Sequence, residues 1–134
     1  MKNYLLLCGG VGGAKLALGF KNSIDPENLT IAVNTGDDFT HLGLRICPDL
    51  DTVMYTLAGE SDISKGWGRK DESWNMLSAL SDMDGETWFQ LGDKDLATHI
   101  QRKYLINSGQ SLKEATHDLC CLLYTSDAAY EWRS

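Results

Sequence analysis

The feature that most constrains the fold of this chain is the segment LLLCGGVGGAKLALGF at residues 5–20, where an apolar run meets four closely spaced glycines. Residues 3–8 are apolar and bounded by glycine, which is typical of a strand buried on both faces of a parallel sheet. The residues from Ala14 to about Ser23 have the apolar spacing of a helix, and the run LTIAVN at 29–34 predicts a second strand. This order predicts a βαβ unit with parallel pairing.

Neither common phosphate-binding pattern fits the glycines of this segment, which are Gly9, Gly10, Gly12 and Gly13. A P-loop requires Ser or Thr after its lysine, whereas Leu16 follows Lys15. The dinucleotide-binding fingerprint would need Gly or Ala where Lys15 stands. Ligands of parallel sheets bind at the carboxyl ends of the strands, so residues 9–13 and 34–38 are expected to face one crevice. Lys15 itself fits either a phosphate contact or a solvated lysine.

Helices dominate the rest of the predicted structure. The sequence predicts them at residues 47–59, 72–77 and 93–106, and a Ser-x-x-Glu capping box at 111–114 predicts a last helix that runs toward Cys120. No third strand is predicted. We therefore expect an α/β fold in which helices flank a parallel sheet that is left unfinished.

Carboxylates are the strongest chemical signal in the chain. Asp37 and Asp38 follow the second predicted strand, and Asp49 and Asp51 open the next predicted helix. Two such pairs can converge on a hard cation such as Mg²⁺, which prefers oxygen ligands. The same residues can equally cap a turn and stabilise a helix N-terminus, and their spacing alone favours neither interpretation. Arg45 lies between the pairs and fits either an ion pair or a contact to an anionic ligand.

Histidines and aromatic residues give weaker signals. His41 fits an exposed loop residue better than a catalytic base, and His99 fits a packing residue on its helix. The aromatic residues of the middle segment can stack against a planar ring, but such residues more often form a core. They are Trp67, Trp74, Trp88 and Phe89.

Charge and composition exclude several function classes. The formal net charge of -7 argues against a nucleic-acid partner, because phosphate binding needs a basic surface. The four cysteines lack C-x-x-C spacing, which predicts free thiols rather than a zinc site or a disulfide framework. The apolar run at residues 4–8 is too short for a signal peptide, and no stretch is long enough to cross a membrane. These features predict a cytoplasmic protein without a membrane partner.

Six blocks of sequence carry a family resemblance: CGGVGGAKL, VNTGDD, HLGLRICPDLDTVMYTLAG, GWG, WFQLGDKDLATHI and SLKEATHDLC. In this order and spacing they resemble the 2-phospho-L-lactate transferase family, whose members build the deazaflavin hydride carrier coenzyme F420. The blocks run from about Tyr4 to Cys120. The resemblance implies a Rossmann-like fold, which agrees with the βαβ unit.

The resemblance also implies an Mg²⁺-dependent transfer of 2-phospholactate or of its enolpyruvyl-phosphate counterpart. The donor is linked to guanosine diphosphate, the acceptor is the ribityl hydroxyl of the deazaflavin FO, and the products are GMP and F420-0 or dehydro-F420-0. Asp37 and Asp49 are the expected metal ligands, and together with Asp51 they are the expected catalytic residues. Which of these carboxylates takes the proton of the hydroxyl stays open. The full-length protein is expected to be a homodimer.

The substrate contacts expected around this site come from both loops and from the start of the next helix. They are Gly9, Gly10, Gly12, Gly13, Lys15, Asn34, Thr35, Asp38, Arg45 and Asp51.

A non-enzymatic alternative is a sugar-nucleotide-binding regulator of the related gluconeogenesis-factor family, which shares the glycine-rich start and the acidic pair. Those regulators continue with a Gly/Ser-rich stretch, whereas this chain continues with FTHLGLRICPDLDT after Asp38. This difference favours the transferase.

The family pattern stops after Cys120, and CLLYTSDAAYEWRS at residues 121–134 resembles a translated sequencing adapter. We therefore expect residues 1–120 to be the N-terminal part of a Rossmann-like transferase domain, truncated before its sheet is complete. Residues 121–134 are then a non-native tail. On this interpretation the 134-residue chain alone is poorly folded and inactive.

Overall fold

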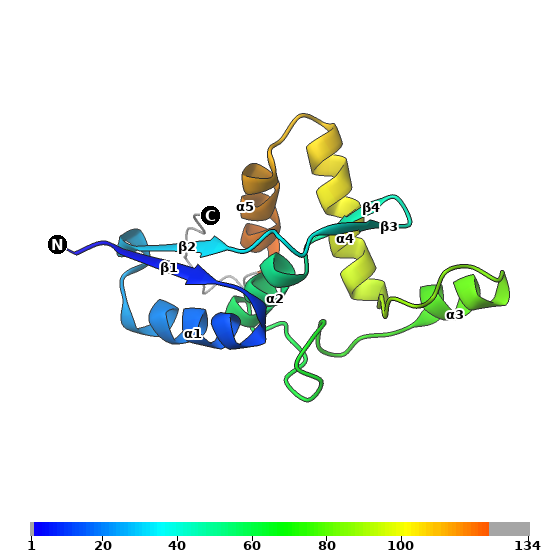
Figure 1. Cartoon of the computed structure of the whole chain (residues 1–134), viewed down its shortest axis with the longest axis horizontal. Coiled ribbons are helices and arrows are strands. Elements are labelled where there is room, and N and C mark those ends of the chain that lie inside the picture. Colours follow the sequence, from blue (N-terminus) through cyan, green and yellow to red (C-terminus); the bar gives the residue numbers. More distant parts are fainter. Residues whose placement is uncertain (1, 124–134) are drawn as a thin grey trace.

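The structure is a computed structural model that describes residues 2–123 of the chain. Figure 1 shows β1, β2 and α1 at one end of the molecule, α2 and α5 near its middle, and α3 at the other end. The elements are β1 (Tyr4–Cys8), α1 (Gly10–Ser23), the 3₁₀ turn η1 (Pro26–Asn28), β2 (Leu29–Val33), β3 (Phe39–His41), β4 (Leu44–Ile46), α2 (Pro48–Leu57), α3 (Asn75–Asp82), α4 (Asp93–Asn107) and α5 (Leu112–Leu123).

The predicted βαβ unit is confirmed. β1 and β2 pair in parallel with Leu6 beside Ile31, and α1 connects them. α1 packs closely on β1 at Gly13, where an added Cβ would lie 2.9 Å from the Cβ of Cys8. Gly13 thus permits the close helix–strand packing that the third glycine of a dinucleotide-binding fingerprint provides, although it stands two positions earlier than the fingerprint requires.

β1 is exposed along most of its length, so the prediction that it is buried on both faces is wrong. Leu5 and Leu7 are 65% and 73% exposed, whereas Leu6 and Cys8 on the opposite face pack into the core. Within the described residues this sheet has two strands, β1 and β2, and the core packs against one face of it. The other face, with Leu5 and Leu7, is therefore exposed. An apolar run predicts a strand, but it does not identify the neighbours that cover the strand.

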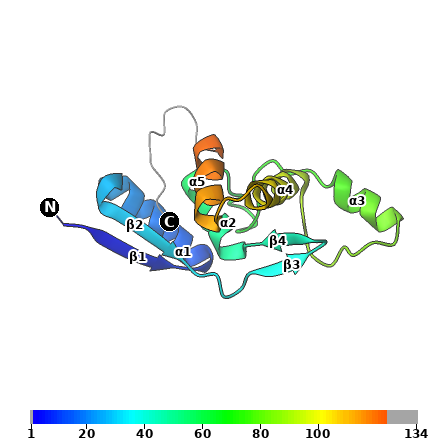
Figure 2. The same ribbon diagram turned by 90° about the horizontal axis from the view of Figure 1, so that it is seen from above.

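The chain also forms a β-hairpin that was not predicted. β3 and β4 pair antiparallel around the turn residues Leu42 and Gly43, and the hairpin lies beside α4 (Figure 2). The sequence signal is weak because each strand has only three residues. Leu42 also has a φ of 53°, a conformation in which Asn, Asp or Gly is the usual residue of such a turn.

Two helices differ in their bounds from the prediction. α1 begins at Gly10 rather than at Ala14, so three of the four glycines form its first turn. α3 covers residues 75–82 rather than 72–77, because Glu72 and Ser73 bond to the start of α4 instead of continuing α3. The predicted bounds of α2 and α4 agree within two residues. The predicted capping box is confirmed at Ser111 and Glu114.

α2 lies at the centre of the molecule and is buried on two sides. Val53 and Met54 belong to the core that α1, β1, β2 and α5 share, whereas Asp51 and Tyr55 interact with side chains of α4. The four cysteines are free thiols, as predicted. None of the helices within residues 2–123 has the length and apolar character that a membrane crossing requires.

Candidate functional site

The carboxyl ends of β1 and β2 meet the first turn of α2 at one place, the strand-end site, made by Gly9, Gly10, Asn34, Asp37 and Asp49. The N–H of Gly10, at the amino end of α1, donates to Asp49 Oδ1 at 3.0 Å. An added Cβ at Gly9 would lie 3.2 Å from Asp49 Oδ2 and 3.3 Å from the Cβ of Asn34. The loops after β1 and β2 therefore face each other, as predicted.

Asn34 joins two of the predicted carboxylates. Its Nδ2 donates to Asp49 Oδ2 at 2.9 Å and to Asp37 Oδ2 at 3.4 Å, and its Oδ1 accepts from the N–H of Gly36 at 3.0 Å. Asn34 and Asp37 are exposed and Asp49 is half-buried. The oxygens of Asp37 and Asp49 are ligands of the kind that a hard divalent cation prefers, and in this structure the NH₂ group of Asn34 lies between them.

The remaining residues predicted for this site lie around its rim or outside it. Asp38 is paired with Arg45 at 3.3 Å, and its N–H donates to the carbonyl oxygen of Thr35 in the turn after β2. Gly12 is exposed in the first turn of α1. Lys15 lines a separate cavity of about 480 Å³ between α1, α2 and residues 59–70, so it does not point into the strand-end site.

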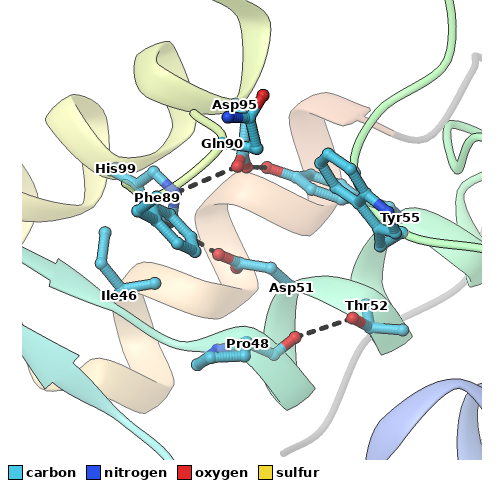
Figure 3. A pocket seen from close by; sticks show the side chains of 11 residues that line it. Ile46, Pro48, Asp51, Thr52, Tyr55, Phe89, Gln90, Asp95 and His99 are labelled. Carbon is cyan, nitrogen blue, oxygen red and sulfur yellow. Dashed lines mark hydrogen bonds and ion pairs between the residues drawn. The ribbon is translucent and has the colours of Figure 1, made fainter. Parts of the chain in front are cut away.

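A further cavity, the aromatic cavity, lies where α2 faces α4 and has a volume of about 330 Å³ (Figure 3). Residues from α2 and α4 supply most of its polar groups, and residues 67–68 and 89–90 complete its wall. Its aromatic lining consists of Tyr55, Trp67 and Phe89, and its ionisable side chains are Asp51, Asp95 and His99.

Asp51 faces the aromatic cavity and not the strand-end site. Asp49 and Asp51 are two positions apart on α2, and side chains at this spacing point to different faces of a helix. Asp51 is 5% exposed, and its Oδ1 accepts from the guanidinium of Arg102 on α4. The two predicted carboxylate pairs therefore do not converge: Asp37 and Asp49 share one site, and Asp51 belongs to another.

The ion pair of Asp51 and Arg102 is almost completely buried. Burial raises the pKa of the Asp51 carboxyl, and the charges of Arg102 and His99 oppose this rise. Burial acts to lower the pKa of Arg102, and the Asp51 carboxylate acts to raise it. The effect of the carboxylate is larger, together with smaller contributions, so the pKa of Arg102 is raised. A buried guanidinium needs an ionised partner, and Asp51 is the carboxylate that contacts it, so we treat the pair as ionised.

His99, Asp95 and Tyr55 extend this pair into a network (Figure 3). Arg102 Nη1 lies 3.3 Å from His99 Nδ1, His99 Nε2 lies 3.3 Å from Asp95 Oδ2, and the Tyr55 hydroxyl donates to Asp95 Oδ1 at 2.6 Å. Burial acts to raise the pKa of Asp95, but the contacts of His99 and Tyr55 outweigh it and lower that pKa. Burial raises the pKa of Tyr55 well above its ordinary value.

The same three ionisable residues could in principle ligate a metal, since their ligand atoms lie within 4.8 Å of one another. The imidazole of His99, however, lies between the two carboxylates, with Asp51 Oδ2 3.7 Å from Nδ1 and Asp95 on the side of Nε2. A cation would also compete with the guanidinium of Arg102 for Asp51. The cluster is therefore better described as a charge-balanced network than as a metal centre.

Four members of this network were not among the predicted site residues: Tyr55, Asp95, His99 and Arg102, of which His99 was expected only to pack on its helix. A signal for them does exist in the sequence. Asp95, His99 and Arg102 follow one another at steps of four and three, which puts them on one helix face, and Asp51 and Tyr55 are four apart on α2. Polar stripes on two helices that can face each other indicate a buried network.

The expectations for the other histidine and for the tryptophans need correction. His41 is 3% exposed, because it packs against Trp88 and Phe89, with ring centroids 5.1 and 5.6 Å away. Trp67 and Trp88 are 44% and 67% exposed, so they are wall and surface residues rather than core. The expected packing role of His99 is confirmed by its burial, and its ionic contacts add to that role.

Comparison with known proteins gives a family match over most of the chain. The family model described as 2-phospho-L-lactate transferase CofD matches residues 5–128. A phosphoenolpyruvate transferase of Kitasatospora aureofaciens is 45% identical over 116 residues, which cover 85% of this chain and 36% of that protein. Those of Streptomyces coelicolor and Mycolicibacterium smegmatis are each 44% identical, and the matches cover 87% and 86% of this chain and 37% and 38% of those proteins.

The chain thus spans a little over a third of the length of the curated relatives it matches. The family match extends to residue 128, within the segment 121–134 that we expected to be non-native. Residues 121–123 end α5, and residues 124–134 lie outside the described residues. The expectation of a non-native tail stays a prediction.

Proposed function

The chain belongs to the 2-phospho-L-lactate transferase family, and on this premise we propose that the full-length protein carrying this sequence passes a phosphate-linked three-carbon acid to the deazaflavin FO. The donor is linked to guanosine diphosphate, and the reaction is a step in the synthesis of coenzyme F420. The observation that carries the proposal is the strand-end site, where the amino end of a helix meets two carboxylates at the carboxyl ends of parallel strands.

The relatives support one donor over the other. The three that we compare are phosphoenolpyruvate transferases. We therefore propose the enolpyruvyl donor, which gives dehydro-F420-0, rather than the lactyl donor, which gives F420-0. GMP is the second product in either case.

The diphosphate of the donor is assigned to the strand-end site. The first turn of α1 has backbone N–H groups at Gly10, Gly12 and Gly13 without an acidic side chain of its own, and such a helix terminus favours phosphate. Asp37 and Asp49 would hold Mg²⁺ beside it, because both carboxylates are accessible and adjacent to the same amide. The ion would supply charge neutralisation for the diphosphate.

The planar acceptor is assigned to the aromatic cavity. Its 330 Å³ volume falls in the range of small-molecule sites, and Trp67 and Phe89 offer ring faces for stacking. α2 carries residues of both sites, with Asp49 in the strand-end site and Asp51 in the aromatic cavity. This helix therefore brings the donor and the acceptor together.

The transfer forms one phosphorus–oxygen bond and breaks another. The ribityl hydroxyl oxygen of FO attacks the phosphorus that bears the enolpyruvyl group, and the bond from that phosphorus to the GMP oxygen breaks with its electron pair. The hydroxyl proton passes to a carboxylate of the predicted set, which is Asp37, Asp49 or Asp51. The protein contributes mainly by positioning and by charge neutralisation.

The test is an assay of the full-length protein with FO, the guanosine-diphosphate-linked donor and Mg²⁺, measuring GMP release and the deazaflavin product. Asp37→Ala and Asp49→Ala are each expected to lower kcat at least about a hundredfold, because each removes a carboxylate from the charge-compensating set. Chelation of the metal should abolish transfer, and added Mg²⁺ should restore it.

The matched control is Asp82→Asn on α3, an exposed aspartate outside both sites, which should retain full activity. Thermal unfolding of all variants separates loss of chemistry from loss of folding. Undiminished transfer by both alanine variants would refute the assignment of the strand-end site.

A further inference from the structure

Two lysines without an ion-pair partner line the cavity between α1, α2 and residues 59–70, which we call the lysine cavity. They are Lys15 on α1 and Lys70 at the end of the loop, and neither pairs with an acidic side chain within residues 2–123. The acidic residue of the lining, Asp62, is paired with Lys65 at 3.8 Å and accepts backbone N–H groups of its own loop. In a chain with a formal net charge of -7, this cavity therefore attracts an anion.

The body of the lysine cavity is apolar, with a few hydroxyl groups. The apolar lining includes Val11, Leu18, Ile63 and Trp67, and the hydroxyl groups include those of Thr52, Thr56 and Ser61. The volume of about 480 Å³ falls in the range of small-molecule sites, which combine an apolar wall with a small number of polar groups. An inorganic anion gains nothing from such a wall, so the lining favours an anion with a carbon body.

The lysine cavity adjoins the aromatic cavity. The residues that line both are Thr52 and Tyr55 on α2 and Trp67 and Gly68 of the loop. In Figure 3, which is drawn at the aromatic cavity, Thr52 and Tyr55 belong to this shared wall. Because Trp67 is part of both linings, a layer of side chains separates the two cavities on the loop side. A flexible chain that leads out of the aromatic cavity past this layer enters the lysine cavity.

The lysine cavity also lies next to the strand-end site. Val11, in its lining, directly follows Gly10, whose N–H belongs to the strand-end site. Thr52 follows Asp49 by three positions on α2, and residues at this spacing are neighbours on a helix surface. A group bonded to a phosphate at the strand-end site therefore has the lysine cavity beside it.

We propose that the lysine cavity binds the acid end of the deazaflavin product, meaning the phosphate and the three-carbon carboxylate that the transfer adds to FO, and that Lys15 and Lys70 are its charge partners. This inference rests on the proposed function, in which the ring of the acceptor lies in the aromatic cavity. The ribityl chain then crosses the shared wall at Trp67. The added group carries one negative charge on its phosphate and one on its carboxylate, and the two lysines compensate them.

The first experiment compares two ligands of the full-length protein, FO and the deazaflavin product, by the fluorescence of their common ring. The variants are Lys15→Gln, Lys70→Gln and the double variant, because glutamine keeps a polar side chain without the charge. Each single change should weaken binding of the product about threefold, and the double change at least about tenfold. FO lacks the acid end, so all three variants should bind FO as the wild type does.

The matched control is Lys113→Gln on α5, an exposed lysine that lines neither cavity, which should bind both ligands as the wild type does. Lys15 and Lys70 are exposed, so their replacement should leave thermal unfolding unchanged. Unchanged product affinity in the double variant, or an equal loss of affinity for FO and for the product, would overturn the proposal.

The second experiment varies the salt concentration for the wild type and for the double variant. Ion pairs between exposed groups are screened by salt, so the affinity of the wild type for the product should fall more steeply with ionic strength than its affinity for FO. The double variant should show the same salt dependence for both ligands. A wild type with equal salt dependence for the two ligands would contradict a charged contact to the acid end.

The outcomes separate this inference from the proposed function. Transfer to FO by a protein whose product affinity does not depend on Lys15 and Lys70 would refute the inference alone. Product binding that depends on both lysines, in a wild-type protein that transfers nothing, would refute the proposed function alone.

Discussion

Gly13 and Gly19 lie in the same helix, α1, in opposite surroundings. An added Cβ at Gly13 would meet the Cβ of Cys8 at 2.9 Å and its Cα at 3.3 Å, whereas nothing lies within 4 Å of one at Gly19. We expect Gly13→Ala to lower the free energy of unfolding by about 1–3 kcal/mol, because β1 and α1 must separate to admit the methyl group. Chemical denaturation of the two single variants measures this.

Gly19→Ala is the internal control for this prediction. It should raise the free energy of unfolding by up to about 1 kcal/mol, since alanine is the better helix former and the site is open. Equal effects of the two substitutions would contradict a packing role for Gly13.

The candidate site shows which residue contacts a sequence can predict. Asn34, Asp37 and Asp49 could be placed together because each follows or opens an element whose order fixes its edge of the sheet. The pairing of Asp51 with Arg102 could not be predicted, because these residues are 51 positions apart and meet through the packing of α2 on α4. Local spacing identifies a polar stripe on each helix, but it does not identify which stripes face each other.

Among the elements, the β3–β4 hairpin has a strained backbone at its turn, and this strain can be tested by substitution. Leu42 and Gly43, the two turn residues, have φ values of 53° and 75°, and a leucine in the left-handed region costs about 1–2 kcal/mol. Leu42 is also 45% exposed, so little apolar burial would be lost on its replacement. We expect Leu42→Asn to raise the free energy of unfolding by about 1 kcal/mol, measured by thermal denaturation.

The matched change on the neighbouring strand is Thr40→Asn, which should be neutral or destabilising, since Thr40 lies in β3 and asparagine is a poor strand former. A stabilisation of similar size in both variants would point to a general effect of asparagine rather than to relief of strain.

A helix or strand could be predicted where its sequence signal lies within a few neighbouring residues, and it was missed or shifted where distant contacts determine it. The βαβ unit and α4 were predicted because apolar periodicity and capping residues are read within a few positions. The hairpin was missed because its turn has a leucine at the position where asparagine is the usual residue and would have indicated a turn. α3 was shifted because Glu72 bonds to the N–H groups of Lys94 and Asp95, which no local pattern shows.

The starts of α3 and α4 cap each other. Asp93 accepts from the N–H groups of Asn75 and Met76 at the start of α3, while Glu72 accepts from the N–H of Lys94 at the start of α4. The Ser73 hydroxyl, together with the N–H of Met76, lowers the pKa of Asp93. Asp93, the first residue of α4, therefore stabilises the start of α3, and Glu72, which precedes α3, stabilises the start of α4.

This reciprocal capping predicts a pH dependence. The folded-state pKa of Asp93 lies below its value of about 3.9 in the unfolded chain. Its contribution to stability is then fully present above about pH 4 and is lost as the pH falls through the folded-state pKa. Asp93→Asn should therefore be less stable than the wild type at pH 7, and the difference should shrink toward pH 3.

Circular dichroism of urea unfolding at both pH values measures this difference, with Asp82→Asn as the control for a general change of charge. A difference for Asp93→Asn that is the same at pH 7 and pH 3 would argue against a role for the ionised carboxylate.

At the scale of the whole molecule, the β1–β2 sheet leaves one apolar face uncovered by the residues that the structure describes. Leu5 and Leu7 point out from it, and apolar side chains on an open strand favour association with other chains. The 134-residue chain is therefore expected to self-associate with rising concentration. The double variant Leu5→Lys/Leu7→Lys should shift sedimentation toward the monomer without loss of thermal stability, because both side chains are already exposed.

Lysine pairs elsewhere on the surface provide the control. Ile100→Lys/Tyr104→Lys on α4 replaces two side chains that are 52% and 65% exposed and lie apart from the sheet. If this pair suppresses association as strongly as the β1 pair, net charge rather than the sheet face is responsible.

The contact between Gly10 and Asp49 would make the proposed phosphate binding at the strand-end site an exchange reaction. The protein's own carboxylate occupies the N–H that an incoming phosphate would use. A phosphate that takes this N–H must displace Asp49, and any partner that draws Asp49 toward Asp37 vacates the N–H. Cation and phosphate would then bind with positive linkage, each raising the affinity for the other by the same factor. On the proposed function, Asp49 would compete with the phosphate for this N–H, and the site without a cation would bind a free anion less tightly than the site with one.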